Sequence, residues 1–198
     1  MKNPAPTQFP INPYAIERWS PRAFSSKPVE KKKLQSLFEA ARWSASAFNE
    51  QPWRFIVGIK GDAAYDKIVE SLIDWNQQWA GHAPVLIMNL AKKTFSHNGK
   101  PNATFQYDLG QSVANIAVEA VYQGLHSHQM SGFDPEKARL LFHIPDDYQP
   151  TSVMAVGYYG HLANLPADMA ESETRSRSRK NLNDLVFTDT FGNSTKLF

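Results

Sequence analysis

The chain has 198 residues, of which 42% are hydrophobic and 20% are charged, and its formal net charge is +2. These values are typical of one soluble globular domain, and the small net charge does not indicate a nucleic-acid or membrane partner. The absence of cysteine excludes disulfides, thiolate nucleophiles and cysteine-ligated metal centres, and is consistent with a reducing compartment such as the cytoplasm. Prolines at positions 4, 6, 10 and 13, without an apolar core, are not typical of a signal peptide.

The first half of the chain predicts helices and strands in alternation. After Pro28, apolar residues at three- and four-residue steps predict a helix that ends near residue 41. Residues 53–59 (WRFIVGI) are aromatic and β-branched, which predicts a strand. Asp62 is the expected N-cap of a helix through about residue 72. The apolar run 84–90 predicts a buried central strand and is too short to cross a bilayer.

The second half contains the longest periodic segment, residues 104–123, whose small residues allow close packing on more than one side. We expect it to be a central helix that ends at Gly124. A short strand should follow, then a helix from the Asp134 cap to residue 142 and a strand over residues 152–159. The elements lack the regular strand–helix–strand period of a doubly wound sheet, so the predicted fold class is α+β.

Two basic segments suit a phosphate group. Arg18, Ser20 and Arg22 place two guanidinium groups around a hydroxyl, although solvated surface arginines are the more common explanation of such a triplet taken alone. The second segment, residues 175–180 (RSRSRK), has three interpretations: a solvated linker, a phosphate site or an RNA-binding arm. Acidic neighbours at positions 171, 173 and 184 argue against the RNA-binding arm.

Residues 42–53 (RWSASAFNEQPW) form the most informative stretch. They join a predicted helix to a predicted strand with small side chains, which let a flat ligand approach the backbone. Asn49 and Gln51 offer neutral donors and acceptors to the polar edge of such a ligand. A planar polar ring together with a phosphate describes a nucleotide-type cofactor, although an ordinary turn before a strand is the simpler alternative.

The Arg18–Arg22 triplet and the 42–53 stretch resemble the nitroreductase family of FMN-dependent oxidoreductases. The resemblance implies a central mixed or antiparallel sheet flanked by helices in a single domain over residues 1–198. It also implies an intertwined homodimer with FMN at two interface sites. Residues 1–13 would form an N-terminal extension, and the apolar residues 181–198 would form a tail exchanged onto the partner subunit.

The same resemblance assigns cofactor-binding residues. The FMN phosphate would be held by residues before the first long helix and by a late arginine pair, and the 46–49 loop would reach the flavin from the other subunit. The amides of the 129–132 loop would face flavin N5 and O4. The assigned residues are Arg18, Trp19, Ser20, Arg22, Ser46, Ala47, Asn49, Asn76, Gln129, Met130, Ser131, Gly132, Arg177 and Arg179.

Three positions depart from the family's pattern. Ala45 stands where many members have proline, which predicts a less rigid loop. Ser131 stands where members often carry glycine or glutamate, and its hydroxyl could alter which acceptors fit. Trp79 replaces a lysine of some relatives, so a contact with the cofactor is missing or replaced.

The implied activity is transfer of hydride from NADH or NADPH through flavin N5 to a small acceptor. The acceptor could be a nitroaromatic, a quinone, an activated alkene or free flavin. The chemistry would be carried by FMN, with no catalytic side chain and no metal. His126 and His128 have metal-like spacing but lack a third ligand at a recognised offset, so no zinc site is predicted. Two alternatives stay open: a flavin-binding protein without turnover, and an RNA-binding protein that uses residues 175–180.

Overall fold

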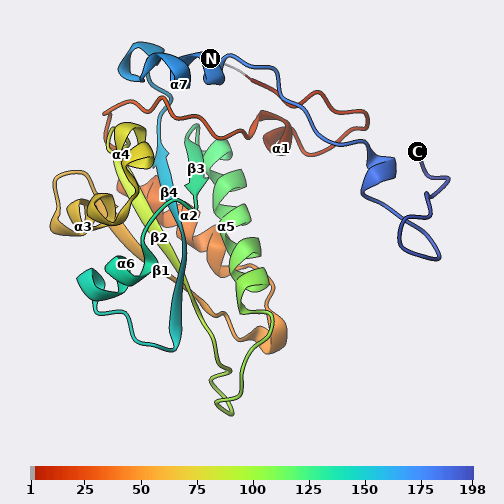
Figure 1. The fold of residues 1–198 in the computed structure, drawn as a ribbon, viewed down its shortest axis with the longest axis horizontal. Helices are drawn as coiled ribbons and strands as arrows, with labels where there is room; N and C mark the ends of the chain where they lie inside the picture. The colour runs from red at the N-terminus through yellow and green to blue at the C-terminus, as the bar shows by residue number, and fades with distance from the viewer. Residues whose placement is uncertain (1–2) are drawn as a thin grey trace.

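The computed structural model describes residues 3–198, so the expected N-terminal extension lies within the described part except for residues 1–2. Four strands form one sheet in the order β1-β2-β4-β3, and every neighbouring pair is antiparallel (Figure 1). The predicted α+β class is therefore confirmed, and the sheet is antiparallel rather than mixed. The strands are β1 (Trp53–Ile59), β2 (Val85–Lys92), β3 (His126–Met130) and β4 (Tyr148–Gly157).

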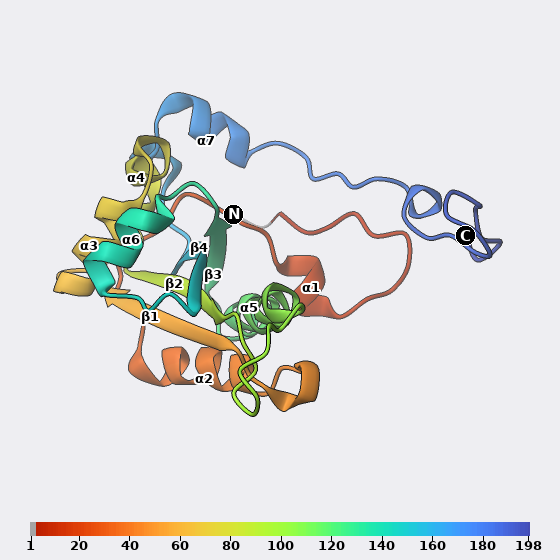
Figure 2. The same cartoon turned by 60° about the horizontal axis from the view of Figure 1, so that its bottom comes forward.

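Helices cover both faces of the sheet (Figure 2). Helices α2 (Lys31–Arg42) and α5 (Phe105–Tyr122) pack on one face, where Val85 and Ile87 of β2 point. Helices α3 (Ala63–Ser71), α4 (Asp74–Ala80) and α6 (Pro135–Phe142) pack on the other face, with Leu86 and Met88. Because alternate residues of a strand point to opposite faces, the continuous apolar run of β2 supplies both cores.

The predicted caps are confirmed. The Asp62 side chain accepts a hydrogen bond from the Tyr65 amide at 2.7 Å, and Asp134 caps α6 through two amides. The predicted boundaries of two elements are wrong. Helix α2 begins at Lys31, later than the apolar residues after Pro28 suggested. Strand β4 begins at Tyr148 and ends at Gly157, because its first residues pair with β2 on the far side of a bulge between Asn89 and Leu90.

Several short elements carry no strong hydrophobic period and were not expected from the sequence. Helices α1 (Pro13–Glu17), α4 and α7 (Ala167–Glu173) have five to seven residues each. The short helical turns are η1 (Ala47–Asn49), η2 (Leu162–Asn164) and η3 (Leu182–Asp184). Helix α5, by contrast, lies within one residue of the predicted limits at both ends.

The N-terminal segment and the last 25 residues extend from the body in the same direction (Figures 1 and 2). Their apolar side chains meet: the Phe9 and Phe198 ring centroids lie 5.8 Å apart. No residue from 174 to 198 is buried, and Phe191 is 94% exposed. The apolar tail therefore does not dock on the core of its own chain. Within residues 3–198, no helix combines the length and apolar character needed to span a bilayer.

Candidate cofactor site

Three arginines from the two ends of the chain gather beside α1. Arg177 donates hydrogen bonds from Nη1 to the Asn3 and Ile16 carbonyls, at 2.9 and 3.1 Å, which draws the segment after α7 against the N-terminal segment. Burial, followed by the charge of Arg179, lowers the pKa of Arg18. Burial, followed by the charges of Arg18 and Arg179, lowers the pKa of Arg177. None of the three forms an ion pair with a carboxylate of residues 3–198, so their charge is available to an anion.

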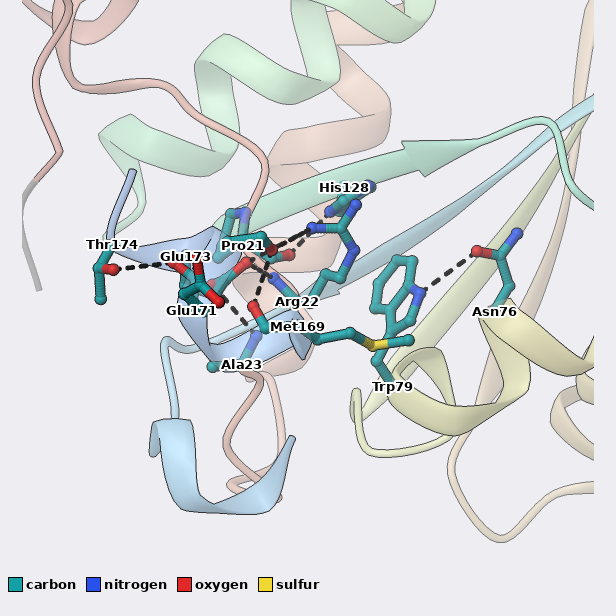
Figure 3. A network of polar contacts seen from close by, with 11 residues as sticks. Pro21, Arg22, Ala23, Asn76, Trp79, His128, Met169, Glu171, Glu173 and Thr174 are labelled. Atoms are coloured by element: carbon teal, nitrogen blue, oxygen red, sulfur yellow. Dashed lines mark hydrogen bonds and ion pairs between the residues drawn. The ribbon is translucent and has the colours of Figure 1, made fainter. Parts of the chain in front are cut away.

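Arg22 belongs to a different contact. Its amide donates to Glu173 Oε1 at 2.9 Å and its Nη1 donates to Ser172 Oγ at 3.2 Å (Figure 3). The ion pair from Nη1 to Glu173 Oε1 measures 3.9 Å. Within the described chain, the buried Nε of Arg22 has no hydrogen-bond partner. The structure thus turns Arg22 toward α7, and sequence reasoning missed Glu173 because 151 residues separate the pair.

The two residues that follow Arg18 differ in exposure: Ser20 faces solvent and Trp19 is buried. Ser20 is exposed, and its Oγ accepts a hydrogen bond from Arg18 Nη1 at 3.3 Å, so the hydroxyl adjoins the cationic cluster. Trp19 is 7% exposed and packs against His126 and Tyr159, with ring centroids 6.0 and 5.6 Å away. The Trp19 side chain is therefore part of the core, which leaves its backbone to contact a ligand.

The loop before β1 is held in an unusual conformation. Phe48, Asn49 and Gln51 all have positive φ values, at 52°, 55° and 51°. Such values are uncommon for residues other than glycine, and strain of this kind concentrates at functional sites. Ser46 Oγ accepts from the Gln51 amide at 3.0 Å, and the Ala47 amide donates to Asp108 Oδ2 at 3.1 Å. The first bond closes the loop on itself, and the second joins the loop to α5.

The loop after β3 presents two unused amides. The N–H groups of Ser131 and Gly132 donate to no acceptor within residues 3–198. The Gly132 carbonyl accepts from Asn76 Nδ2 at 2.8 Å and from the Ile73 amide at 3.2 Å. A Cβ at position 132 would lie 2.5 Å from Asn76 Nδ2, which explains the glycine. Gln129 is exposed, whereas Met130 is 7% exposed and belongs to the core.

Asn76 is itself almost fully engaged within the chain. It is 7% exposed, and its Oδ1 accepts from Trp79 Nε1 at 3.2 Å (Figure 3). With Nδ2 on the Gly132 carbonyl, one N–H of the side chain is left for a ligand. Trp79 is fully buried, so the side chain at this position belongs to the core.

Two of the predicted site segments, the 46–49 loop and the arginine segment that follows α1, lie near opposite ends of α5 (Figure 1). The 46–49 loop bonds to Asp108 near the start of the helix, while Tyr14 of α1 packs on Tyr122 at its end, at 5.3 Å. Fourteen residues of α-helix span about 21 Å. Within one chain the 46–49 loop therefore does not face the arginine cluster.

The two histidines of β3 do not form part of a recognisable metal centre. His128 Nδ1 lies 3.0 Å from the Pro21 carbonyl, and its ring centroid is 4.4 Å from that of Trp79. The ring of His126 packs edge-on against Trp19. Among residues 3–198, no group of three histidine, cysteine or acidic side chains is placed to hold a metal ion.

Comparison with known proteins agrees with this architecture. A model of the nitroreductase family matches residues 15–78 and 66–158. A solved structure described as an oxidoreductase containing FMN is 35% identical, with a TM-score of 0.90 over 96% of this chain and 97% of its own. A nitroreductase family protein from Clostridium difficile is 25% identical, with a TM-score of 0.70 over 89% of this chain and 96% of its own.

Two curated relatives add to the comparison. An uncharacterized 15.4 kDa protein of Mycolicibacterium smegmatis is 34% identical over 150 residues, which is 71% of this chain and 98% of that protein. The major NAD(P)H-flavin oxidoreductase of Aliivibrio fischeri is 41% identical over 66 residues, covering 33% of this chain and 28% of that protein. The antiparallel sheet with helices on both faces defines a protein of the α+β class. The chain belongs to the nitroreductase family.

Proposed function

We propose that the protein is an FMN-dependent oxidoreductase that takes hydride from NADH or NADPH and passes it to a small acceptor. A nitroaromatic, a quinone, an activated alkene or free flavin would serve as the acceptor. The observation that carries the proposal is the cluster of Arg18, Arg177 and Arg179, three cations without a carboxylate partner in the described chain. The names of the relatives, an oxidoreductase containing FMN and an NAD(P)H-flavin oxidoreductase, support the same activity.

The residues present fit FMN. Arg18, Arg177 and Arg179, with the Ser20 hydroxyl, would hold the phosphate through charge-assisted hydrogen bonds. The free amides of Ser131 and Gly132 would donate to the polar edge of the flavin ring. When bound, FMN supplies the hydride chemistry. The protein's contribution is to bind the phosphate, orient the ring and place N–H donors where negative charge develops on reduction.

The second half of each site would come from a second copy of the chain. Ser46, Ala47 and Asn49 lie about 21 Å from the arginine end of α5, by helix length, so they would contact the flavin held by the partner subunit. The exposed apolar tail, residues 181–198, would extend over that partner. We place this homodimer in the cytoplasm, where reduced nicotinamides are plentiful.

The first test is the absorption spectrum of the purified protein after addition of FMN, recorded anaerobically before and after NADH or NADPH. A flavin band that bleaches with either donor supports the proposal. A band that persists with both donors favours the flavin-binding alternative without turnover. A protein that cannot bind FMN refutes the proposal, and steeply salt-dependent RNA affinity would then favour the RNA-binding alternative.

Mixed dimers test the shared site. Arg18→Ala and Asn49→Ala homodimers should each bind FMN weakly at both sites. A dimer that combines one chain of each kind regains one intact site if Asn49 acts in trans, so FMN binding should recover to half the sites. No recovery would contradict the proposed contribution from the partner.

A further inference from the structure

We propose that Trp79 is a positioning residue for the cofactor ring, acting through Asn76 and the Gly132 carbonyl to aim the free amide of Gly132. The inference rests on the proposed function for what this amide faces. The contacts that carry it lie within this chain and can be tested without the cofactor.

The indole of Trp79 fixes the orientation of the Asn76 amide. An indole N–H is a donor only, so the atom of Asn76 that faces Trp79 Nε1 at 3.2 Å must be the carbonyl oxygen Oδ1. The NH₂ group of Asn76 must then point the other way, where it donates to the Gly132 carbonyl at 2.8 Å. Without the indole donor, the amide could rotate and present oxygen to oxygen.

The Gly132 carbonyl in turn fixes the loop. It accepts two hydrogen bonds from α4 and its N-cap, one from Asn76 Nδ2 and one from the Ile73 amide. Next to it, the Phe133 amide donates to the Ser131 carbonyl at 3.0 Å, which closes a tight turn. With both carbonyls held, the peptide planes of the turn are set. The N–H of Gly132, which shares a peptide plane with the Ser131 carbonyl, is therefore held in a fixed orientation.

The Trp79 side chain is itself held in place by burial and by two aromatic neighbours. It is fully buried between Phe24, whose ring is stacked at 6.4 Å, and His128, whose ring lies 4.4 Å away. Burial lowers the pKa of His128 to about 4, so the ring is neutral at pH 7 and its Nδ1–H donates to the Pro21 carbonyl (Figure 3). Pro21 follows the Arg18–Ser20 segment directly. One chain of contacts thus joins the phosphate end of the site to the ring end.

Such an arrangement would affect the flavin's reduction potential more than its binding. Amide donors near a ring carbonyl stabilise the negative charge of the reduced ring more than they stabilise the oxidised ring. We expect Trp79→Phe, which removes the indole donor and keeps an aromatic ring, to lower the affinity for reduced FMN relative to oxidised FMN about tenfold. For a two-electron couple, a tenfold change equals about 30 mV.

Trp75→Phe is the matched control, because Trp75 lies on the same helix but is 47% exposed. The potential of bound FMN is measured by equilibration with a reference dye, and thermal unfolding checks that each variant is folded. In the apoprotein, the ¹⁵N–¹H signals of the Gly132 amide and the Asn76 NH₂ group should shift or broaden in Trp79→Phe. They should be unchanged in Trp75→Phe.

Asn76→Asp provides a second variant if Trp79→Phe does not fold. It keeps an acceptor for the indole but removes the donor to the Gly132 carbonyl, so the potential should fall at least as far. An unchanged potential in the folded variants, with unmoved Gly132 signals, would overturn the proposal. If wild-type protein binds no FMN, the proposed function fails and the role at the ring fails with it. The apoprotein signals would still show whether the hydrogen bonds position the loop.

Discussion

Glu173 is the buried carboxylate that fastens the end of α7 to the segment following Arg18. Its side chain is 1% exposed, and its oxygens accept from the Arg22 amide at 2.9 Å and the Ala23 amide at 3.5 Å. Glu173→Gln keeps the shape but places an NH₂ group where one of these amides needs an acceptor. Leaving one buried donor unsatisfied costs about 1–3 kcal/mol.

Two further terms partly cancel. Burial raises the pKa of Glu173, which means that the charged carboxylate is destabilised by the loss of water around it. The neutral glutamine avoids this destabilisation. Against this, Arg22 loses an ion pair, but at 3.9 Å and with 29% of its side chain exposed that pair contributes less than about 1 kcal/mol. We expect a net loss of about 1–2 kcal/mol. For a chain of 198 residues this lowers Tm by roughly 2–8 °C.

The assay is thermal unfolding of the apoprotein beside Glu171→Gln, a matched control whose carboxylate is 73% exposed and pairs with Arg175 at 3.2 Å. The control should change stability by less than about 0.5 kcal/mol. Because Glu173 lies four residues before Arg177, its loss should also weaken FMN binding more than riboflavin binding. Equal Tm values for the two variants would refute the reasoning. Tighter FMN binding would show that Glu173 acts only by repelling the phosphate.

Three other outcomes are expected. Arg177→Gln should weaken FMN binding about tenfold or more in a fluorescence titration, while Arg175→Gln, which removes an exposed arginine, should change it little. Deletion of residues 181–198 should shift the dimer toward monomer in sedimentation and leave the far-UV spectrum largely intact. The free energy of unfolding, measured in urea, should fall by at most about 3 kcal/mol between pH 6.5 and pH 4. Over this range His128 binds a proton in the unfolded chain but stays mostly neutral in the folded protein, where its pKa is about 4. His128→Gln should remove that part of the pH dependence.

Each of these has a contrary result. If Arg177→Gln and Arg175→Gln lose the same FMN affinity, the loss reflects the net positive charge of the segment and not a specific contact of Arg177. A stable dimer without residues 181–198 would remove the tail from the interface. An identical pH dependence in wild type and His128→Gln would assign the acid loss to other groups. Glu173 cannot supply it, because a carboxyl pKa raised by folding adds stability as the pH falls.

Much of the fold was predictable because its signals are local. The Asp62 and Asp134 caps, the apolar run of β2 and the period of α5 each arise from residues within one element. Hydrogen bonds to nearby amides and burial of one helix face act over a few residues, so the sequence carries them directly. The short helices α1, α4 and α7 lack such a period.

By itself, the sequence determined the chemistry available to the site: basic segments suited to a phosphate, an amide loop and a loop of small residues. Only the tertiary structure decided which of these groups face a ligand and which bond to other parts of the chain. Arg22 looks equivalent to Arg18 in the sequence, yet α7 brings Glu173 to Arg22 and leaves Arg18 beside Arg177. The Asn76 side chain is oriented by its hydrogen bonds to Trp79 and to the Gly132 carbonyl. Helix α5 separates the 46–49 loop from the arginines. Contacts between residues dozens of positions apart depend on how the whole chain packs, and no local pattern encodes them.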